Sequence, residues 1–224
     1  MGAGAVADSS YYRHTRDDIA KLLPGRATRI VDVGCGAGAT LRWLQTIYPG
    51  AHTIALEGNP DLRDELSHNA AEAHILDVSQ DIPELGRPDL VLLLDVLEHL
   101  SDPVTVLKRF VAQLSEDGTV IVSLPNVAHL SVALPLLLRG EFTYRDAGIL
   151  DRTHLRFFDM TSSVELLTVA GLRVDRKIAR LSGRRDRLLD QVSGGSVRSR
   201  FAKQLLLRGR PDTEGPRASR WELV

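Results

Sequence analysis

The sequence predicts an α/β fold, in which a doubly wound, mostly parallel sheet carries helices on both faces. Three observations predict it. Short apolar or β-branched runs alternate with helical segments between residues 29 and 124, as in consecutive βαβ units. The run at 90–94 is almost wholly apolar, as expected of a central strand covered on both faces. The run at 29–33 leads straight into closely spaced glycines, where open α/β sheets bind ligands.

The first half of the chain supplies most of the expected elements. A helix is predicted at 11–23, because Pro24 and Gly25 end it after a small, polar N-terminus. Apolar and β-branched runs closed by Gly, Asp or Pro predict strands, and the segments between them predict helices. The expected strands are 29–33, 52–56, 73–76, 90–94 and 119–124, and the expected helices are 39–48, 61–71 and 103–114.

After Pro125 the regular alternation of predicted strands and helices stops. Residues 126–160 hold no clear strand but several aromatic and basic residues. Because a connection of this length in a compact domain tends to be functional, we expect a substrate-binding insertion here. The remaining predicted elements are a helix at 161–170, a strand at 172–178, an Arg-rich solvated stretch at 180–217 with a helix at 197–207, and a last strand at 219–224.

Composition limits the possible classes of protein. With 43% hydrophobic and 25% charged residues, residues 1–224 are expected to form one globular domain. A net charge of -1 argues against nucleic acid and anionic membrane as partners, and the apolar runs are too short to span a bilayer. Cys35 is the single cysteine, so no intramolecular disulfide forms, which agrees with a cytoplasmic location.

The loop at 32–38 points to a nucleotide-like ligand, since a strand, glycines and a helix N-terminus together expose backbone N–H groups. Gly34, Gly36 and Ala39 also fit a dinucleotide fingerprint, and Glu57 follows at the distance of a ribose-binding carboxylate. A NAD-dependent oxidoreductase is therefore one alternative. Three features argue against it. Asp32 would repel a pyrophosphate but suits an ammonium group, Gly38 continues the alternate glycines, and Asp77 after the third strand suits an adenine.

These motifs resemble those of class I S-adenosylmethionine (SAM)-dependent methyltransferases. Residues 31–38, Val-Asp-Val-Gly-Cys-Gly-Ala-Gly, look like the first motif of that family, and residues 94–99, Leu-Asp-Val-Leu-Glu-His, look like its fourth. The resemblance spans roughly residues 29–180. It implies a Rossmann-like, seven-stranded sheet whose last strand is antiparallel, with SAM as the cofactor.

The same resemblance implies roles for individual residues. Glu57 matches the acidic residue that binds both ribose hydroxyls, Asp77 and Val78 match the adenine-binding positions, and the backbone of the fourth motif lies along the methionyl group. The full set implied for SAM binding is Asp32, Gly34, Cys35, Gly36, Gly38, Glu57, Gly58, Asp77, Val78, Asp95 and Val96.

The segments at 123–129 and 148–158 are similar to a bacterial subgroup that includes MetW-like proteins and methyltransferases of sugars or natural products. The expected partner is thus a small-molecule acceptor, with O-methylation of a sugar or natural product as the leading hypothesis. A non-catalytic, regulatory SAM-binding protein of the MetW-like kind is the other alternative. A homodimer is a possible assembly.

Asp95, Glu98 and His99 would share one face if their segment is helical. Such donors suit Mg²⁺, Mn²⁺, Zn²⁺ or Fe²⁺. Ubiquinone-biosynthesis O-methyltransferases and small-RNA 3′-end methyltransferases carry a similar metal-holding pattern, and His154 resembles the later histidine of the RNA enzymes. A metal site of Asp95, Glu98, His99 and His154 is one hypothesis, and polar residues without a metal are the other.

His154 and His129 are the candidate general bases, because an imidazole of ordinary pKa takes up a proton near neutral pH. His154 is favoured, since it lies in the polar insertion beyond the fifth strand. Tyr11, Tyr12 and Arg13 are expected either to fold over the cofactor or to pack on the sheet. Cys35 is expected to be a small loop residue and not a nucleophile.

Overall fold

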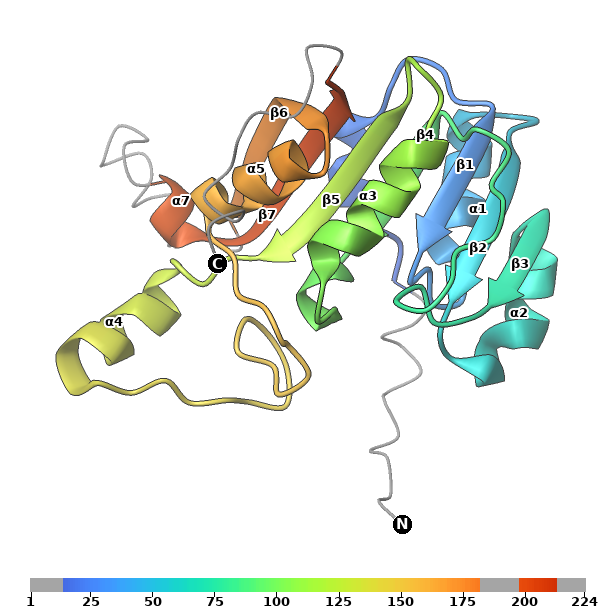
Figure 1. The fold of residues 1–224 in the computed structure, drawn as a ribbon. Coiled ribbons are helices and arrows are strands. Elements are labelled where there is room, and N and C mark those ends of the chain that lie inside the picture. The colour runs from blue at the N-terminus through green and yellow to red at the C-terminus, as the bar shows by residue number, and fades with distance from the viewer. Residues whose placement is uncertain (1–13, 182–197, 213–224) are drawn as a thin grey trace.

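The computed structural model describes residues 14–181 and 198–212. It contains a seven-stranded sheet in the order β3-β2-β1-β4-β5-β7-β6, drawn in Figure 1. β7 pairs antiparallel with both β5 and β6, whereas the other strand pairs are parallel, so the predicted fold class is confirmed. The strands are β1 (Arg29–Val33), β2 (His52–Glu57), β3 (Glu72–Ile75), β4 (Leu90–Leu94), β5 (Thr119–Pro125), β6 (Leu172–Leu181) and β7 (Ala202–Pro211).

Helices cover both faces of this sheet, because the side chains of each central strand alternate between two hydrophobic cores. In β4, Val91 and Leu93 belong to one core while Leu90 and Leu92 belong to the other. The first core contains residues of α3 (Pro103–Gln113) and α5 (Met160–Val169). The second contains residues of η2 (Asp17–Leu22), α1 (Ala39–Ile47) and α2 (Arg63–Asn69). The shorter helices are η3 (Pro60–Leu62), η4 (Leu97–His99), α4 (Leu130–Arg139) and α7 (Arg198–Phe201).

Two terminal predictions need correction. The helix expected at 197–207 is wrong beyond Phe201, since β7 begins at Ala202. Leu205, Leu206 and Leu207 are covered on both faces between β5 and β6, and an apolar run of this length does not distinguish a strand from a helix. In place of an α-helix over 11–23, the described residues contain the 3-10 helix η2. Residues 11–13 and the strand predicted at 219–224 lie outside the described residues.

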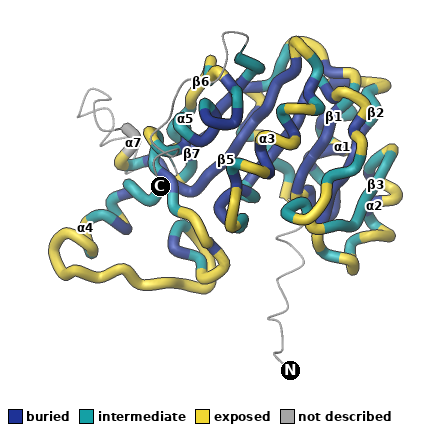
Figure 2. The backbone as a smooth tube through the Cα atoms, viewed as in Figure 1, coloured by how far each residue is buried: buried dark blue, intermediate teal, exposed yellow. Residues whose placement is uncertain are grey.

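The segment between β5 and α5 projects from the edge of the sheet (Figures 1 and 2). It begins with α4, which exposes Leu137 and Leu138 by 79% and 74%. A long, largely exposed connection follows, and Figure 2 shows that the exposed backbone is nearly continuous there. Among the helices that the structure describes, none is long and apolar enough to cross a membrane.

Candidate active site

The motif residues form a row along the carboxyl edge of the sheet. The strand order β3-β2-β1-β4 places Asp77, Glu57, the glycine-rich loop and Asp95 after successive neighbouring strands. Strand order reverses between β1 and β4, where open α/β sheets bind their ligands. All four belong to the set that the family resemblance implies for SAM binding.

The glycine-rich loop has a backbone that L-amino acids with side chains rarely adopt. Gly34, Gly36 and Gly38 all have positive φ, between 56° and 79°. A Cβ atom at Gly34 would lie 2.7 Å from Cγ2 of Val96, and one at Gly38 would lie 3.0 Å from Cβ of Asn69. Asn69 also donates from its side chain to the carbonyl of Ala37 at 2.7 Å. The loop is thus held tightly between α2 and the end of β4.

Glu57 ends β2 with its carboxylate bound to the loop. Its Oε2 accepts the N–H of Gly36 at 2.8 Å and its Oε1 accepts the N–H of Asn59 at 2.9 Å. Each carboxylate oxygen accepts about two hydrogen bonds, so both oxygens keep one lone pair for a ligand. Gly58 follows at an exposed position. At the far end of the row, exposed Asp77 accepts the N–H of Ser79 at 2.9 Å and precedes Val78, which packs against the core.

Asp32 lies in β1 and is only 3% exposed. Burial raises the pKa of this carboxyl to about 7, with a further rise from Glu57 and an opposing effect of the Arg16 cation. A cationic ligand group beside Asp32 would favour its ionised form. Cys35 is buried, and burial raises the pKa of its thiol far above the usual range, which agrees with a structural role.

Asp95 does not share a helical face with Glu98 and His99, so the geometric premise of that prediction is wrong. Its φ of +60° turns the chain away before η4 begins at Leu97. Its carboxylate accepts Nη1 of Arg16 at 2.6 Å, Oγ of Ser123 at 2.9 Å and Nε2 of Gln204. Asp95 thus belongs to a polar network on the cofactor side of the site.

Glu98, His99 and His154 converge, with one potential ligand atom from each lying within 4.8 Å of the others. The two imidazoles meet edge to face at a centroid distance of 4.8 Å. Nδ1 of His154 bonds the carbonyl of Ile149 at 3.0 Å, and Nδ1 of His99 bonds the carbonyl of Thr153 at 3.3 Å. Because a carbonyl only accepts, both Nδ1 atoms carry a proton, and in the neutral imidazole the lone pair is then on Nε2.

Glu98 is 1% exposed, and its Oε2 has no hydrogen-bond partner among the described residues. Burial, followed by the nearby Asp95 charge, raises the pKa of Glu98 well above its usual value. Burial and His154 lower the pKa of His99. An unpartnered buried carboxylate oxygen beside two imidazoles fits a divalent cation, and backbone carbonyls that fix metal-binding histidines are common.

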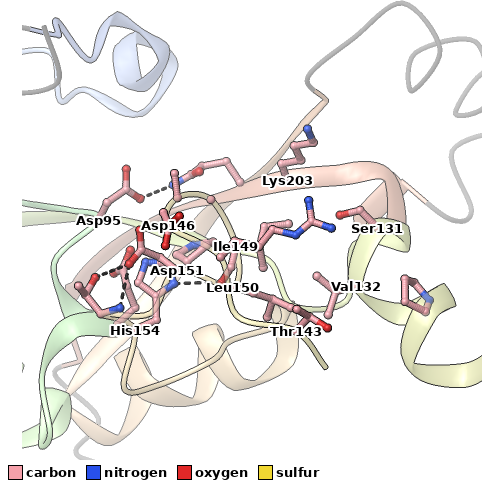
Figure 3. A pocket seen from close by; sticks show the side chains of 18 of the residues that line it. Asp95, Ser131, Val132, Thr143, Asp146, Ile149, Leu150, Asp151, His154 and Lys203 are labelled. Atoms are coloured by element: carbon pink, nitrogen blue, oxygen red, sulfur yellow. Dashed lines mark hydrogen bonds between the residues drawn. The ribbon is translucent and has the colours of Figure 1, made fainter. Parts of the chain in front are cut away.

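A cavity of about 990 Å³ adjoins this cluster. Asp95 and Gln204 line its cofactor side, Ser131 and Val132 of α4 line another wall, and residues 145–151 of the insertion close over it. Figure 3 shows His154 and Asp151 below Asp95, with Ser131 and Val132 some way from them and Lys203 above. The insertion predicted from the sequence therefore supplies much of the cavity wall.

The aromatic residues of the insertion pack against one another or into the core. Phe142, Tyr144 and Phe157 contact one another edge to face or tilted, at centroid distances of 5.3–6.1 Å, and Phe158 is buried in the core. They do not belong to the lining that the described residues give the cavity, whose apolar part comes from residues such as Val132, Ile149 and Leu150.

The arginines of the insertion differ in their partners and in whether they line the cavity. Arg152 pairs with Asp146 at 3.0 Å, and Arg156 donates to the carbonyl of Ser101. Neither belongs to the described lining of the cavity, whereas Arg145 does. Of Arg145, Arg152 and Arg156, Arg145 alone therefore shares the described cavity wall with His154.

His129 begins α4 as its N-cap. Its Nδ1 accepts the N–H of Ser131 at 3.1 Å, and the residue is 6% exposed. It is not one of the residues that line the cavity in the described part of the chain. This placement favours a capping role, and its role as a base stays a prediction without geometric support.

Sequence reasoning missed three partners of Asp95. Arg16 comes from η2's N-terminal boundary, Ser123 from β5 and Gln204 from β7. Arg16 and Gln204 are distant from every motif in the sequence, so no local pattern signals them. Ser123 lies in the segment 123–129 that resembles the subgroup, and its position opposite Leu94 in the parallel register is the signal that could have found it.

The sequence profile of the methyltransferase domain family matches residues 8–177 of this chain. The chain belongs to that family. A ubiquinone biosynthesis O-methyltransferase of Xanthomonas campestris is 28% identical over 185 residues, which cover 72% of this chain and 73% of that protein. This SAM-dependent methyltransferase is therefore not the NAD-dependent oxidoreductase that the glycine spacing left open.

Solved structures show the same fold. A SAM-dependent methyltransferase from Mesorhizobium loti superposes with a TM-score of 0.62 at 15% identity, covering 86% of this chain and 95% of the other. The O-methyltransferase of a multienzyme of Brevibacillus brevis, solved with S-adenosyl-L-homocysteine, gives a TM-score of 0.55 at 16% identity, covering 88% of this chain and 70% of that one. Membership in the family supports SAM as the cofactor of this chain.

Proposed function

We propose that this enzyme transfers the methyl group of SAM to a hydroxyl group of a small sugar or natural product bound in the cavity beside His154. The observation that carries the proposal is the convergence of Glu98, His99 and His154 on a cavity whose opposite side reaches Asp95. An acceptor there lies next to the row of cofactor residues. The related ubiquinone biosynthesis O-methyltransferase supports oxygen as the acceptor atom.

The row of motif residues along the carboxyl edge of the sheet would bind SAM in a single orientation, from its adenine to its methionyl group. Asp77 and Val78 would contact the adenine, and the two spare lone pairs of Glu57 would accept the ribose hydroxyls. Asp32 would face the ammonium of the methionyl group, with the loop glycines and the backbone at Asp95 and Val96 beside it. This order follows the strand order β3-β2-β1-β4, and it directs the methionyl end toward the cavity.

The chain's own residues would then orient and deprotonate the acceptor. Holding the hydroxyl in line with the methyl group removes much of the entropic barrier. His154 is 9% exposed, and its Nδ1–H is fixed by Ile149. Its Nε2 is therefore available to take the hydroxyl proton, while the insertion excludes water from the reacting atoms. Arg145 would bind polar or acidic groups of the acceptor elsewhere in the cavity.

Glu98, His99 and His154 would also hold a divalent ion, because their free oxygen and Nε2 atoms fit a hard or borderline cation. An ion at this site would lower the pKa of a bound acceptor hydroxyl. In that case His154 serves as a ligand, and Asp95 is not one. The two roles of His154 are distinguishable by experiment.

The test is release of S-adenosylhomocysteine from SAM across a panel of hydroxylated acceptors, with the methylated atom located by mass spectrometry. We expect an O-methylated product with wild-type protein. Turnover that stops in chelator and returns with one of Mg²⁺, Mn²⁺, Zn²⁺ or Fe²⁺ assigns the metal role. Full activity in chelator, with no metal by elemental analysis, leaves His154 as the base. SAM binding without turnover on any acceptor would favour the regulatory alternative.

A cytoplasmic location and a homodimer belong to the same proposal. The single cysteine, Cys35, is buried and free, which supports a reducing compartment. Fractionation of cells and light scattering of purified protein test these two statements.

A further inference from the structure

Two cationic side chains line the acceptor cavity without an anionic partner. Lys203 is the second residue of β7, and Arg145 belongs to the insertion. Both residues are exposed. Neither side chain has a hydrogen bond or an ion pair within the part of the chain that the structure describes. An anion that entered the cavity would therefore meet two cations that are free to bind it.

Three of the carboxylates that line the same cavity are bound to donors of the protein. Asp146 pairs with Arg152 at 3.0 Å, and Glu141 pairs with Arg139 at 2.8 Å. Asp95 accepts from the polar network on the cofactor side. Because these carboxylates already have donors, their repulsion of an incoming anion is reduced.

The other two carboxylates of the described lining, Glu98 and Asp151, lie at the histidine end of the cavity. Glu98 belongs to the cluster with His154. Asp151 accepts the N–H and the hydroxyl of Thr153 at 2.8 and 2.7 Å, and its carbonyl accepts the N–H of His154 at 3.1 Å. Figure 3 shows Lys203 well apart from His154 and Asp151. An anionic group beside Lys203 would thus lie away from this acidic end.

Arg145 is positioned by a hydrogen-bonded turn. Its N–H donates to the carbonyl of Leu150 at 2.8 Å, and its carbonyl accepts the N–H of Arg152 at 3.0 Å. Leu150 is buried. The same turn contains Ile149, whose carbonyl fixes Nδ1 of His154 at 3.0 Å. The candidate base and this cation are therefore held by the same short segment of the insertion.

Lys203 is positioned by the sheet. Its carbonyl accepts the N–H of Asn126, directly after β5, at 2.9 Å. The next residue, Gln204, donates from its side chain to Asp95. The second cation therefore belongs to the edge of the sheet, beside the polar network, and not to the insertion.

We infer that the acceptor is an anion: a hydroxylated molecule whose phosphate or carboxylate group is bound by Lys203 and Arg145 while its hydroxyl lies beside His154. The inference rests on the proposed function and narrows its class of substrate. A neutral acceptor would leave both cations without a partner, whereas hydrogen bonds from a cation to phosphate or carboxylate are about twice as strong as neutral ones. The distance between the anionic group and each hydroxyl then selects the hydroxyl that reaches His154.

Calorimetry with two anions tests the inference without knowledge of the acceptor. The protein is saturated with S-adenosylhomocysteine and freed of metal, so that neither the glycine-rich loop nor a bound ion takes up the probes. Inorganic pyrophosphate and citrate are the probes, and their relative affinities distinguish a phosphate site from a carboxylate site. We expect Lys203→Gln or Arg145→Gln to weaken binding of the preferred probe by about 3- to 10-fold, and the double variant by about 10- to 100-fold. Wild-type affinity should also fall as salt is added.

Arg156→Gln and Lys177→Gln are the matched controls. Each removes one positive charge from an exposed residue that is not part of the described cavity lining, so affinity should stay within about twofold of the wild type. Failure of both anions to bind the wild type, or an equal loss of affinity in the controls, overturns the inference.

Matched acceptors supply a second arm of the test. Protocatechuate and its methyl ester differ in a free carboxylate, and ribose phosphate and ribose differ in a phosphate. We expect a higher kcat/KM for the anionic member of a pair, and Lys203→Gln should reduce that preference. An equal or higher kcat/KM for the neutral member overturns the inference. Anion binding without release of S-adenosylhomocysteine from SAM on any acceptor would instead refute the proposed function and leave the anion site standing.

Discussion

The cofactor side and the acceptor side of this enzyme are built in different ways. Asp32 and Glu57 lie at the ends of buried parallel strands, at most 9% exposed, and the loop between them is held by Glu57, Asn69 and Val96. The acceptor side depends on α4 and a long exposed connection that fold back onto Glu98. In the proposed enzyme the sheet would thus bind the cofactor, and the largely exposed insertion would bind the acceptor.

The largest expected effect is a loss of turnover without a loss of SAM affinity, which would separate the acceptor side from the cofactor side. His154→Ala should lower turnover roughly 10²-fold or more, the usual size of a lost general base, with SAM affinity little changed. Single-turnover kinetics and calorimetry measure the two quantities. Arg152→Ala is the control from the same insertion, because Arg152 pairs with Asp146 and does not line the cavity. Wild-type turnover of His154→Ala across neutral pH would remove His154 from the mechanism.

The second effect lies on the cofactor side. Glu57→Ala removes two charge-assisted hydrogen bonds to the ribose, each worth roughly 1.5–3 kcal/mol, so SAM affinity should fall by about tenfold or more. Because Glu57 also accepts from Gly36 and Asn59, thermal unfolding must show that the variant is folded. Unchanged calorimetric affinity in a folded variant contradicts the ribose assignment.

The third effect is a pH dependence of cofactor binding. Asp32 has a pKa of about 7 in the free protein, and its ionised form should bind the ammonium. Affinity for S-adenosylhomocysteine should therefore weaken by about tenfold from pH 8 to pH 6, since one proton competes with the ligand. Asp32→Asn should flatten this profile. A wild-type profile that is already flat over this range would show that Asp32 does not bind the ammonium.

The same pKa has a consequence for the free protein. The folded pKa of Asp32 lies above the model value of 3.8, so the folded state binds more protons between about pH 4 and pH 7. The contribution of Asp32 to the free energy of unfolding therefore decreases as pH rises through that window. Asp32→Asn should remove this contribution, which denaturant unfolding at pH 5 and pH 8 measures.

The smallest expected effect concerns acceptor affinity. Arg145→Ala should raise KM for the acceptor by roughly threefold to tenfold and leave kcat nearly unchanged, because an exposed cation at the cavity wall contributes to binding in the ground state and the transition state alike. Arg156→Ala is the control, as its guanidinium donates to the carbonyl of Ser101 outside the cavity. Equal KM values for the two variants would remove Arg145 from acceptor recognition.

The sequence by itself determined the cofactor side of this protein. The strands at 29–33, 90–94 and 119–124, the glycine loop and Glu57 were predictable, because strand periodicity, glycine backbone freedom and the βαβ rule all act over short stretches of chain. The edge of the sheet on which the site lies follows from those elements alone. Even the mostly parallel sheet with one antiparallel strand followed from the family resemblance that these motifs carry.

Only the tertiary structure decided the polar network and the last strand. Arg16 and Gln204 reach Asp95 across 79 and 109 residues of sequence, and His154 meets Glu98 and His99 because residues 155 and 156 donate to the carbonyl of Glu98. The residues 202–211 form a strand because β5 and β6 offer them two partners, which local periodicity does not report. Such contacts join segments that are distant in the sequence. They form only when the whole chain packs, so no local sequence pattern predicts them.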